Sequence, residues 1–470
     1  MIPIPEYAGR EVAVFGLARS GLSAAKALLA GGAQVFAWDD MEVARTRAEA
    51  EGVPVRDINT RDWRSFAALV LAPGVPLNFP KPHRVVELAR AVGVPVVSDV
   101  ELFARAVAAR PAHARPKIVA VTGTNGKSTT SALIAHCLAS SGRDVRLGGN
   151  IGRAVLDLEP LHAGAIYVLE LSSFQLELIE SLRADVAVFL NFAPDHLDRH
   201  GTLARYFEAK RRIFRNQGAG DWAVLGVDCA ETSALVTKLT AEGARKVAAV
   251  SNRQALGRGV SVLGGKLYDA LEQAGEPVLD LAQAQALPGL HNGQNAAAAY
   301  AACRALGMDR RKLAAAIAGF AGLPHRLELA GVVGGVRCIN DSKATNADAA
   351  AQALAVYPRV RWIVGGRAKE GGLAALEPLF GRVEAAYCIG EAGGEFARFL
   401  ELKGVRAALC GELAQAVRQA LDDALRAKDE NTVVLLSPAC ASYDQFRDFE
   451  ERGEAFKALV ARASAAFSAA

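Results

Sequence analysis

KIVAVTGTNGKSTTS, residues 117–131, joins an apolar run of strand length to a glycine-containing loop, and the apolar helical segment ALIAHCLA follows at once. A tight loop between a buried strand and a helix N-terminus points backbone N–H groups at an anion, and the helix dipole adds to the attraction. Glycines let the backbone approach phosphate oxygens, because a Cβ would be in the way. The pattern predicts a phosphate site with Lys127 at the β- and γ-phosphates and the Ser128 hydroxyl on Mg²⁺. Its residues are Gly123, Thr124, Asn125, Gly126, Lys127, Ser128 and Thr129.

One position departs from the general phosphate-loop motif. That motif has a glycine five positions before the Gly of its Gly-Lys pair, and this chain has Val121 there. The alternative interpretation is a glycine turn that only happens to end in Lys-Ser. The strand before the loop and the helix after it argue against that alternative, so we expect ATP to bind here.

Short runs rich in Val, Ile and Leu alternate with longer Ala- and Leu-rich helical stretches along the chain. Such runs are typical of parallel strands that helices cover on both faces. They predict strands at residues 12–15, 35–38, 68–72, 94–97, 118–122, 166–171, 186–190, 361–364, 386–389 and 433–436. We therefore expect an α/β fold with a Rossmann-like N-terminal domain, a central phosphate-loop ATPase-like domain with a parallel sheet, and a Rossmann-like C-terminal domain.

Two breaks in this alternation predict the domain boundaries. Residues 107–117, VAARPAHARPK, are rich in Pro and Arg, and the Gly-Leu-Pro of residues 322–324 follows an Ala-rich helical segment. We expect domains at residues 1–111, 112–323 and 324–470. A length of 470 residues also suggests three domains at about 150 residues each.

The composition excludes several classes of protein. A chain that is 51% hydrophobic and 22% charged can bury a core, so it is globular. The net charge of +4 argues against a general nucleic-acid or membrane-surface binder. Seven scattered cysteines without a CxxC pair indicate free thiols in a reducing compartment. With neither a signal peptide nor an apolar stretch of about 20 residues, we expect a cytoplasmic protein without nucleic-acid or membrane partners. We also expect a monomer.

A second loop of the phosphate-binding kind follows the first predicted strand. GLARSG, residues 16–21, lies between that strand and a helix, and the next strand ends at Asp39 and Asp40. This is the layout of a nucleotide-binding βαβ unit, in which an acidic residue follows about 20 positions after the loop. Ala18 replaces the middle glycine of G-x-G-x-x-G, so the loop favours a diphosphate on the helix N-terminus without specifying a dinucleotide. We expect this ligand on Gly16, Leu17, Ala18, Arg19, Ser20 and Gly21.

Two nucleotide loops in one chain separate the functional hypotheses. A nicotinamide-dependent oxidoreductase would use the first loop and leave the second idle. A nucleotide-driven switch or motor would use only the second. A ligase that consumes ATP and acts on a nucleotide-linked substrate uses both.

Motifs along nearly the whole chain carry a resemblance to one family. TGTNGKSTT resembles the ATP loop of the Mur ligases and the related folylpolyglutamate synthetases, whose loop also lacks the early glycine. Further motifs follow in the family's order: GGNIG (148–152), LELSSFQLE (169–177), NFAPDHLDRHG (191–201), YFEAKRRIF (206–214), GLHNGQN (289–295), GLPHRLE (322–328), NDSKATN (340–346), GGRAK (365–369) and SPACASYDQF (437–446).

The motifs also bear on which kind of member this is. Folylpolyglutamate synthetases lack a UDP-binding N-terminal domain, and the members that add diaminopimelate or lysine usually carry a DNP-type motif that is absent here. LSSFQLE, NDSKATN and SPACASYDQF resemble the members that add D-glutamate to UDP-N-acetylmuramoyl-L-alanine. The resemblance thus implies an ATP-dependent amide ligase of peptidoglycan precursor synthesis that works through an acyl phosphate and releases ADP and phosphate. The alternatives are a sister Mur ligase with another amino acid and, from a different class, the oxidoreductase.

Four side chains besides Lys127 are expected at the reaction centre. Glu170 ends an apolar strand beside the phosphate-loop strand, and the resemblance makes it a Mg²⁺ ligand. The spacing of His196 and His200 invites a zinc site, but Leu197 replaces the Glu of H-E-x-x-H and no third ligand follows, so we reject zinc hydrolysis. Resemblance assigns His196 to a second Mg²⁺ and leaves His200 structural. It also adds Lys343 and Lys210, the latter as a carbamate facing the second metal, where a solvated surface lysine is the alternative.

The remaining site residues come from the resemblance alone. It places Asn292 and Asn295 near adenine, Arg326 and Asp341 near ribose and phosphates, Asp39 near the nucleoside of the UDP substrate, and Asn150 on its sugar-linked part. For D-glutamate it implies Thr345 and Lys369 at the α-carboxylate, and Ser437 with the backbone near Phe446 at the side-chain carboxylate. Lys369 follows Arg367 and Ala368. These two residues are uncommon at the corresponding positions of the family's loop.

Overall fold

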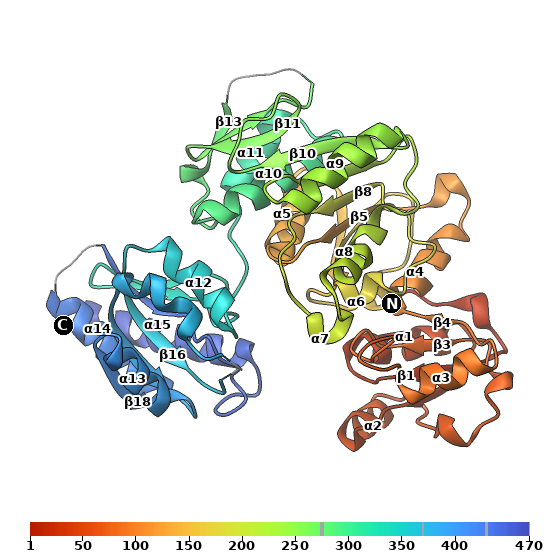
Figure 1. Cartoon of the computed structure of the whole chain (residues 1–470), viewed down its shortest axis with the longest axis horizontal. Coiled ribbons are helices and arrows are strands. Elements are labelled where there is room, and N and C mark those ends of the chain that lie inside the picture. The colour runs from red at the N-terminus through yellow and green to blue at the C-terminus, as the bar shows by residue number, and fades with distance from the viewer. Residues whose placement is uncertain (273–276, 369–370, 428–430, 470) are drawn as a thin grey trace. The chain divides into compact units, whose positions relative to one another are not determined.

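The structure is a computed structural model that describes residues 1–272, 277–368, 371–427 and 431–469 (Figure 1). The chain forms two compact units. The first comprises Met1–Gln283 and Asn292–Gly319, and the second comprises Ala284–His291 and Phe320–Ala470. Sheets of four, nine and six strands alternate with helices, so the predicted α/β class is confirmed.

A four-stranded parallel sheet begins the first unit. Its strand order is β2-β1-β3-β4, with β1 Glu11–Phe15, β2 Gln34–Trp38, β3 Leu69–Leu71 and β4 Val96–Val97, and helices α1 Arg19–Ala30, α2 Glu42–Ala50, α3 Arg84–Ala91 and α4 Asp99–Ala108. Side chains alternate between the two faces of a strand. Val12 and Val14 therefore share an apolar cluster with α1, while Ala13 and Phe15 share another with α3. The loop between β1 and α1 leaves this sheet at the carboxyl end of a central strand.

The second sheet has nine strands in the order β13-β12-β11-β10-β9-β8-β5-β7-β6. The strands are β5 Lys117–Thr122, β6 Asp144–Gly149, β7 Ala165–Glu170, β8 Val186–Phe189, β9 Trp222–Gly226, β10 Lys246–Ser251, β11 Gly259–Leu263, β12 Lys266–Asp269 and β13 Pro277–Asp280. Strands β5 to β11 pair in parallel, whereas β12 and β13 add an antiparallel edge. Because β5 lies between β7 and β8, the phosphate loop emerges beside the carboxyl ends of both neighbours.

Helices of this part begin at or near several of the motifs. They are α5 Lys127–Ser140, α6 Ser173–Leu176, α7 Leu197–His200, α8 Leu203–Arg211, α9 Ala230–Glu242, α10 Leu290–Ala305 and α11 Arg310–Ala318. One apolar cluster runs from Val14 of the first sheet through Phe103 to Tyr167 and Phe189 of the second. The rings of Phe103 and Tyr167 lie 5.3 Å apart. The first two predicted domains therefore share a core within one unit, and their boundary near residue 111 stays a prediction.

The second unit is built on a six-stranded sheet in the order β14-β15-β19-β16-β17-β18, parallel except for the β14–β15 pair. Its elements are β14 Glu328–Val333, β15 Val336–Asn340, α12 Ala347–Val356, β16 Arg359–Gly365, β17 Val383–Ile389, α13 Gly393–Leu402, β18 Ala407–Gly411, α14 Leu413–Ala427, β19 Thr432–Leu436 and α15 Phe449–Ala469. Helix α14 buries Leu413, Val417, Ala420 and Leu421, an apolar stripe of helical period that faces the sheet.

All seven cysteines are free, as predicted. Among the described residues, no helix combines the length and the apolar character that a membrane span requires.

Candidate active site

The predicted phosphate loop connects β5 to α5. Gly126 is the N-cap of α5 and has φ +81°, a left-handed conformation that glycine adopts without strain. A Cβ on Gly126 would lie 2.2 Å from Asn295 Oδ1, so the position is also closed to larger residues. Lys127 Nζ donates hydrogen bonds to the carbonyl oxygens of Gly123 at 3.0 Å and Thr124 at 2.7 Å. The loop therefore wraps around the lysine at the start of an uncapped helix.

Asn292 and Asn295, on α10, are buried behind this loop. Asn295 Oδ1 accepts a hydrogen bond from Thr130 Oγ1 at 3.2 Å, and Asn295 Nδ2 donates to Asn292 Oδ1 at 2.9 Å. The contact with Gly126 places Asn295 against the phosphate loop itself. Its position near adenine, implied by the resemblance, stays a prediction.

Glu170, at the end of β7, combines burial with an unpaired oxygen. The residue is 1% exposed, and its Oε1 accepts a hydrogen bond from Asn150 Nδ2 at 2.7 Å. Oε2 makes no hydrogen bond among the described groups. A buried carboxylate oxygen without a partner carries a desolvation cost that a cation offsets, so Glu170 fits a metal ligand.

The described residues contain no group of three or more His, Cys, Asp or Glu that could hold a metal ion. Mg²⁺ takes six oxygens and is often bound through one or two carboxylates plus phosphates and water. A single carboxylate beside a phosphate loop therefore suits Mg²⁺ bound together with a nucleotide and does not suit a zinc site.

Lys210, on α8, is 1% exposed. Its Nζ donates a hydrogen bond to the Gly123 carbonyl oxygen at 2.8 Å and lies 4.7 Å from the centre of the Tyr206 ring. Burial, together with the nearby charge of Lys127, lowers the pKa of Lys210 well below its ordinary value. The surface-lysine alternative is therefore wrong.

The two histidines of the DHLDRH segment have different surroundings. His196 has φ +52° and a side chain that is 47% exposed, and partial burial lowers its pKa, with Lys210 and Lys127 adding to the effect. His200 is buried, and its Nε2 lies 3.0 Å from Ser173 Oγ. His196 thus faces the cavity described next, and His200 packs inside the protein.

One cavity of about 510 Å³ connects the two nucleotide loops. Its lining comes from both sheets: Gly16, Ala18, Arg19, Ser20, Asp39, Ala72, Pro73, Gly74, Val75, Lys127, Asn150, Ser172, Ser173, Phe174, Gln175, His196 and Lys210. The cavity therefore extends from the first-domain loop to the predicted reaction centre. At its first-domain end, the Leu17 N–H donates a 2.6 Å hydrogen bond to Asp39 Oδ2, which ties the loop to the end of β2.

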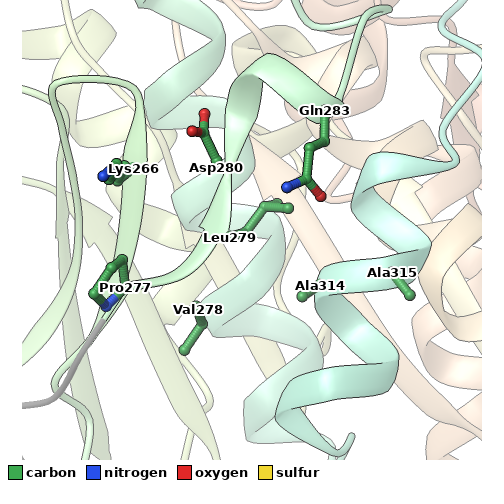
Figure 2. Close-up of a pocket in the computed structure, with 8 residues that line it drawn as sticks. All are labelled: Lys266, Pro277, Val278, Leu279, Asp280, Gln283, Ala314 and Ala315. Carbon is green, nitrogen blue, oxygen red and sulfur yellow. The ribbon is translucent and has the colours of Figure 1, made fainter.

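A second cavity, of about 480 Å³, lies between the antiparallel edge and α11 (Figure 2). Figure 2 shows Lys266 and Asp280 on one side, Ala314 and Ala315 of the helix on the other, and Gln283 above these alanines. None of the predicted site residues lines this cavity, so its size alone does not make it the active site.

In the second unit, Asp341 and Ser437 meet where β15 and β19 end. Ser437 Oγ donates a 2.8 Å hydrogen bond to Asp341 Oδ2, and both residues are buried. Burial raises the pKa of Asp341 to about 7, although the hydrogen bonds from Ser437 and Leu327 and the charge of Arg326 act in the opposite direction. The Ser437 hydroxyl is therefore engaged by Asp341, and a ligand carboxylate would have to compete for it.

The other predicted residues of this unit lie on neighbouring loops. Lys343 Nζ lies 3.6 Å from the centre of the Phe449 ring, and the Thr345 N–H donates to the Lys343 carbonyl at 2.8 Å. Phe446 is partly buried against the apolar cluster of α14. Lys369 lies outside the described residues.

Comparison with known proteins identifies the family. The model of the Mur ligase middle domain matches residues 121–303, and that of the Mur ligase glutamate ligase domain matches residues 325–440. A UDP-N-acetylmuramoylalanine–D-glutamate ligase of Phenylobacterium zucineum is 57% identical over 460 residues, 98% of each chain. The chain belongs to the Mur ligase family.

Further Mur ligases support this assignment. The enzyme of the same name from Agrobacterium fabrum is 47% identical over 462 residues, which cover 98% of this chain and 97% of that one. Among solved structures, the UDP-N-acetylmuramate–alanine ligase of Thermotoga maritima aligns with a TM-score of 0.59 at 19% identity, over 97% of this chain and 99% of that one. At that identity the likeness shows a shared Mur ligase fold.

Several residues of this Mur ligase were not singled out from sequence. Tyr206 packs its ring on Lys210, and its hydroxyl lies 3.3 Å from Thr124 Oγ1. Asn191 Oδ1 accepts a 2.9 Å hydrogen bond from the Asn125 N–H of the phosphate loop. In the second unit, buried Arg452 donates from Nη2 to the carbonyl oxygens of Ser342 at 2.9 Å and Cys440 at 3.1 Å. Tyr206, Asn191 and part of the Arg452 environment lie in recognised motifs, but their roles depend on contacts that sequence does not specify.

Proposed function

We propose that this Mur ligase joins D-glutamate to UDP-N-acetylmuramoyl-L-alanine at the expense of ATP, in peptidoglycan precursor synthesis. The observation that carries the proposal is the single cavity of about 510 Å³ that runs from the UDP-type loop to Lys127, His196 and Lys210. It gives a nucleotide-linked substrate room to place its far end at the phosphate loop. The relatives that share 57% and 47% of the sequence bear the name of this reaction.

The chemistry explains why both loops are needed. A carboxylate does not acylate an amine at neutral pH unless it is activated. In the proposed reaction, an oxygen of the L-alanyl carboxylate attacks the γ-phosphorus of ATP and ADP leaves, which gives an acyl phosphate. The amine of D-glutamate then attacks the carbonyl carbon, phosphate leaves with the bridging oxygen, and the nitrogen loses a proton. The protein's task is to position these groups and to neutralise negative charge.

Each residue around the cavity has a proposed part in that task. Lys127 and the N–H groups of residues 123–129 would bind the phosphates of ATP, which Mur ligases use. Ser128, Glu170, His196 and the carbamate of Lys210 would hold two Mg²⁺ ions, which would neutralise charge on the transferred phosphoryl group. The unpaired Oε2 of buried Glu170 supports a cation there. Residues 16–21, Asp39 and Asn150 would hold the UDP-sugar.

The second unit would supply the amino-acid site. Thr345 and Lys369 would bind the α-carboxylate of D-glutamate, and Ser437 with the backbone near Phe446 would bind its side-chain carboxylate. Arg326, Asp341 and Lys343 would lie near the nucleotide. We further propose that the protein is a cytoplasmic monomer. Its domain boundaries would lie at residues 111 and 323.

Mass spectrometry of the product tests this function. Purified protein with Mg²⁺, ATP, D-glutamate and UDP-N-acetylmuramoyl-L-alanine should convert the nucleotide substrate into a species heavier by one glutamyl residue. Omission of ATP should abolish the conversion. A glutamyl product formed without ATP would contradict the proposal, and nicotinamide reduction with the same substrate would favour the oxidoreductase.

A further inference from the structure

Arg19 connects the first-domain loop to a loop of the nine-stranded sheet that lies more than a hundred residues further along the chain. Its Nη1 donates a 2.7 Å hydrogen bond to the Gly152 carbonyl oxygen. Its Nη2 donates to the carbonyl oxygens of Asn150 at 2.9 Å and Gly149 at 3.4 Å. One guanidinium therefore donates to three backbone carbonyls, one at the end of β6 and two in the segment that follows it.

The place of Arg19 in α1 is not explained by helix stability. It is the first residue of a helix whose N-cap, Ala18, makes no side-chain capping bond. The dipole at a helix N-terminus favours an anion and disfavours a cation. A diphosphate at this N-terminus would remove the conflict, because it would be attracted both by the N–H groups of α1 and by the guanidinium. Arg19 also lines the cavity that reaches the reaction centre.

The loop that accepts these hydrogen bonds from Arg19 is also hydrogen-bonded, through Asn150, to Glu170. The Asn150 N–H donates a 2.8 Å hydrogen bond to the Glu170 carbonyl oxygen, and Asn150 Nδ2 donates a 2.7 Å bond to Glu170 Oε1. Asn150 thus fixes one carboxylate oxygen and leaves Oε2 without a partner among the described groups. The position of Asn150 consequently sets the direction of the oxygen that is proposed to meet Mg²⁺.

We propose that Arg19 is a positioning residue that couples occupation of the nucleotide-sugar site to the binding of Mg²⁺ with ATP, through the Gly149–Gly152 carbonyls, Asn150 and Glu170. This inference rests on the proposed function. A bound diphosphate immobilises the guanidinium, which then holds the loop and Glu170 in one arrangement. Coupling between two sites is reciprocal, so each ligand tightens the binding of the other.

Calorimetric titration of Mg²⁺–ADP, with and without saturating UDP-N-acetylmuramoyl-L-alanine and with no amino acid present, measures this coupling without turnover. In the wild type, the nucleotide-sugar should tighten Mg²⁺–ADP binding by about fivefold or more. In Arg19→Met, which keeps an unbranched side chain in place of the methylene stem but loses the guanidinium donors, the tightening should fall below about twofold. Lys26→Met on the same helix is the matched control, because Lys26 lies about two turns beyond Arg19 and pairs with Glu51. It should keep the wild-type coupling.

Two further variants test the path of the coupling. Arg19→Lys retains the charge but cannot bond several carbonyls at once, so it should retain less than half of the wild-type tightening. In an Asn150→Ala background, Arg19→Met should cause no additional loss, because residues that act through one path are non-additive. Additive losses in the double variant would overturn the inference.

The proposed function and this inference fail in different ways. A wild-type protein that forms no glutamyl product would reject the proposed function. A wild-type protein that forms the product but binds Mg²⁺–ADP equally with and without the nucleotide-sugar would reject the inference alone. So would an Arg19→Met variant that keeps the full wild-type tightening.

Discussion

The ε-amino group of Lys210 lies 2.8 Å from the carbonyl oxygen of Gly123, the first glycine of the phosphate loop, and is buried. Burial lowers the pKa of this amine well below its usual value. An ordinary lysine, with a pKa near 10.4, is uncharged in only about one molecule in 2,500 at pH 7. Because CO₂ reacts with the neutral amine, the surroundings of Lys210 favour the carbamate proposed as a metal ligand.

Lys210→Ala should therefore lose nearly all activity and keep its affinity for ATP, since the phosphate loop remains. Formate or acetate at high concentration should restore part of the phosphate release by occupying the place of the carbamate. Lys238→Ala, at an exposed position on α9, is the control and should behave as wild type. A Lys210→Ala protein that is active without added acid would show that no carbamate is needed.

Gly126 precedes α5 and Gly142 follows it. Alanine variants of the two glycines distinguish the effect of backbone strain from the effect of a steric clash. Gly126 and Gly142 have φ of +81° and +79°, but a Cβ would meet Asn295 only at Gly126 and nothing within 4 Å at Gly142. Both alanine variants should lose roughly 1 kcal/mol of stability to the left-handed conformation. Only Gly126→Ala should also weaken ATP binding, by about tenfold or more, an effect measured by calorimetry and converted at 1.4 kcal/mol per tenfold. Equal ATP affinities in the two variants would mean that contact with Asn295 does not shape the loop.

Lys127→Ala tests the phosphate loop itself. Loss of a cation that meets developing negative charge should reduce phosphate release by about 10³-fold. Lys127 lines the same cavity as the first-domain loop but is not part of that loop. Its loss should therefore leave the affinity for UDP alone unchanged, and any change in binding should concern the rest of the nucleotide-sugar. Phosphate release close to the wild-type rate would refute the assignment.

The pH dependence of stability should report on Asp341. Burial raises its pKa to about 7, whereas an unfolded chain gives about 3.9. The folded state therefore holds a proton that the unfolded state has released, and this stabilisation is complete below about pH 4 and is lost as the pH rises through about 7. Relative to Asp341→Asn, the wild type should lose up to about 4 kcal/mol of unfolding free energy over that window.

Urea unfolding at about pH 4.5 and pH 8 measures the difference. Asp422→Asn, at an exposed position, should show no such change with pH. A wild-type protein that gains stability relative to Asp341→Asn as the pH rises would mean that Asp341 is ionised in the folded state.

Local patterns predicted the elements that carry the site. The strand, glycine loop and helix around Lys127 and the strand ending at Glu170 lie where sequence placed them, because apolar runs and glycine positions are local signals. The antiparallel edge of β12 and β13 was not predicted, since strand pairing depends on partners outside the run. The contact between Ser437 and Asp341 likewise requires β15 and β19 to be neighbours, although 96 positions separate the two residues.

Burial of individual polar residues was the hardest property to predict. Lys210 lies next to Arg211 and Arg212 on a polar helix, so its helical context predicts exposure, yet it is turned inward onto Tyr206 and Gly123. Arg19 gives no sequence signal of its contacts with Gly149, Asn150 and Gly152, because those partners lie at or just after the end of a strand of another sheet. Family resemblance pointed to Lys210, and only the fold connects Arg19 to Glu170.

Amino-acid selectivity of phosphate release tests the central claim most directly. Purified protein with Mg²⁺, ATP and UDP-N-acetylmuramoyl-L-alanine should release phosphate when D-glutamate is added. It should release almost none with L-glutamate, D-glutamine, L-lysine or diaminopimelate, because a charged partner left unpaired in a buried site costs about 1–3 kcal/mol or more. Faster release with any of those four amino acids than with D-glutamate would contradict the account.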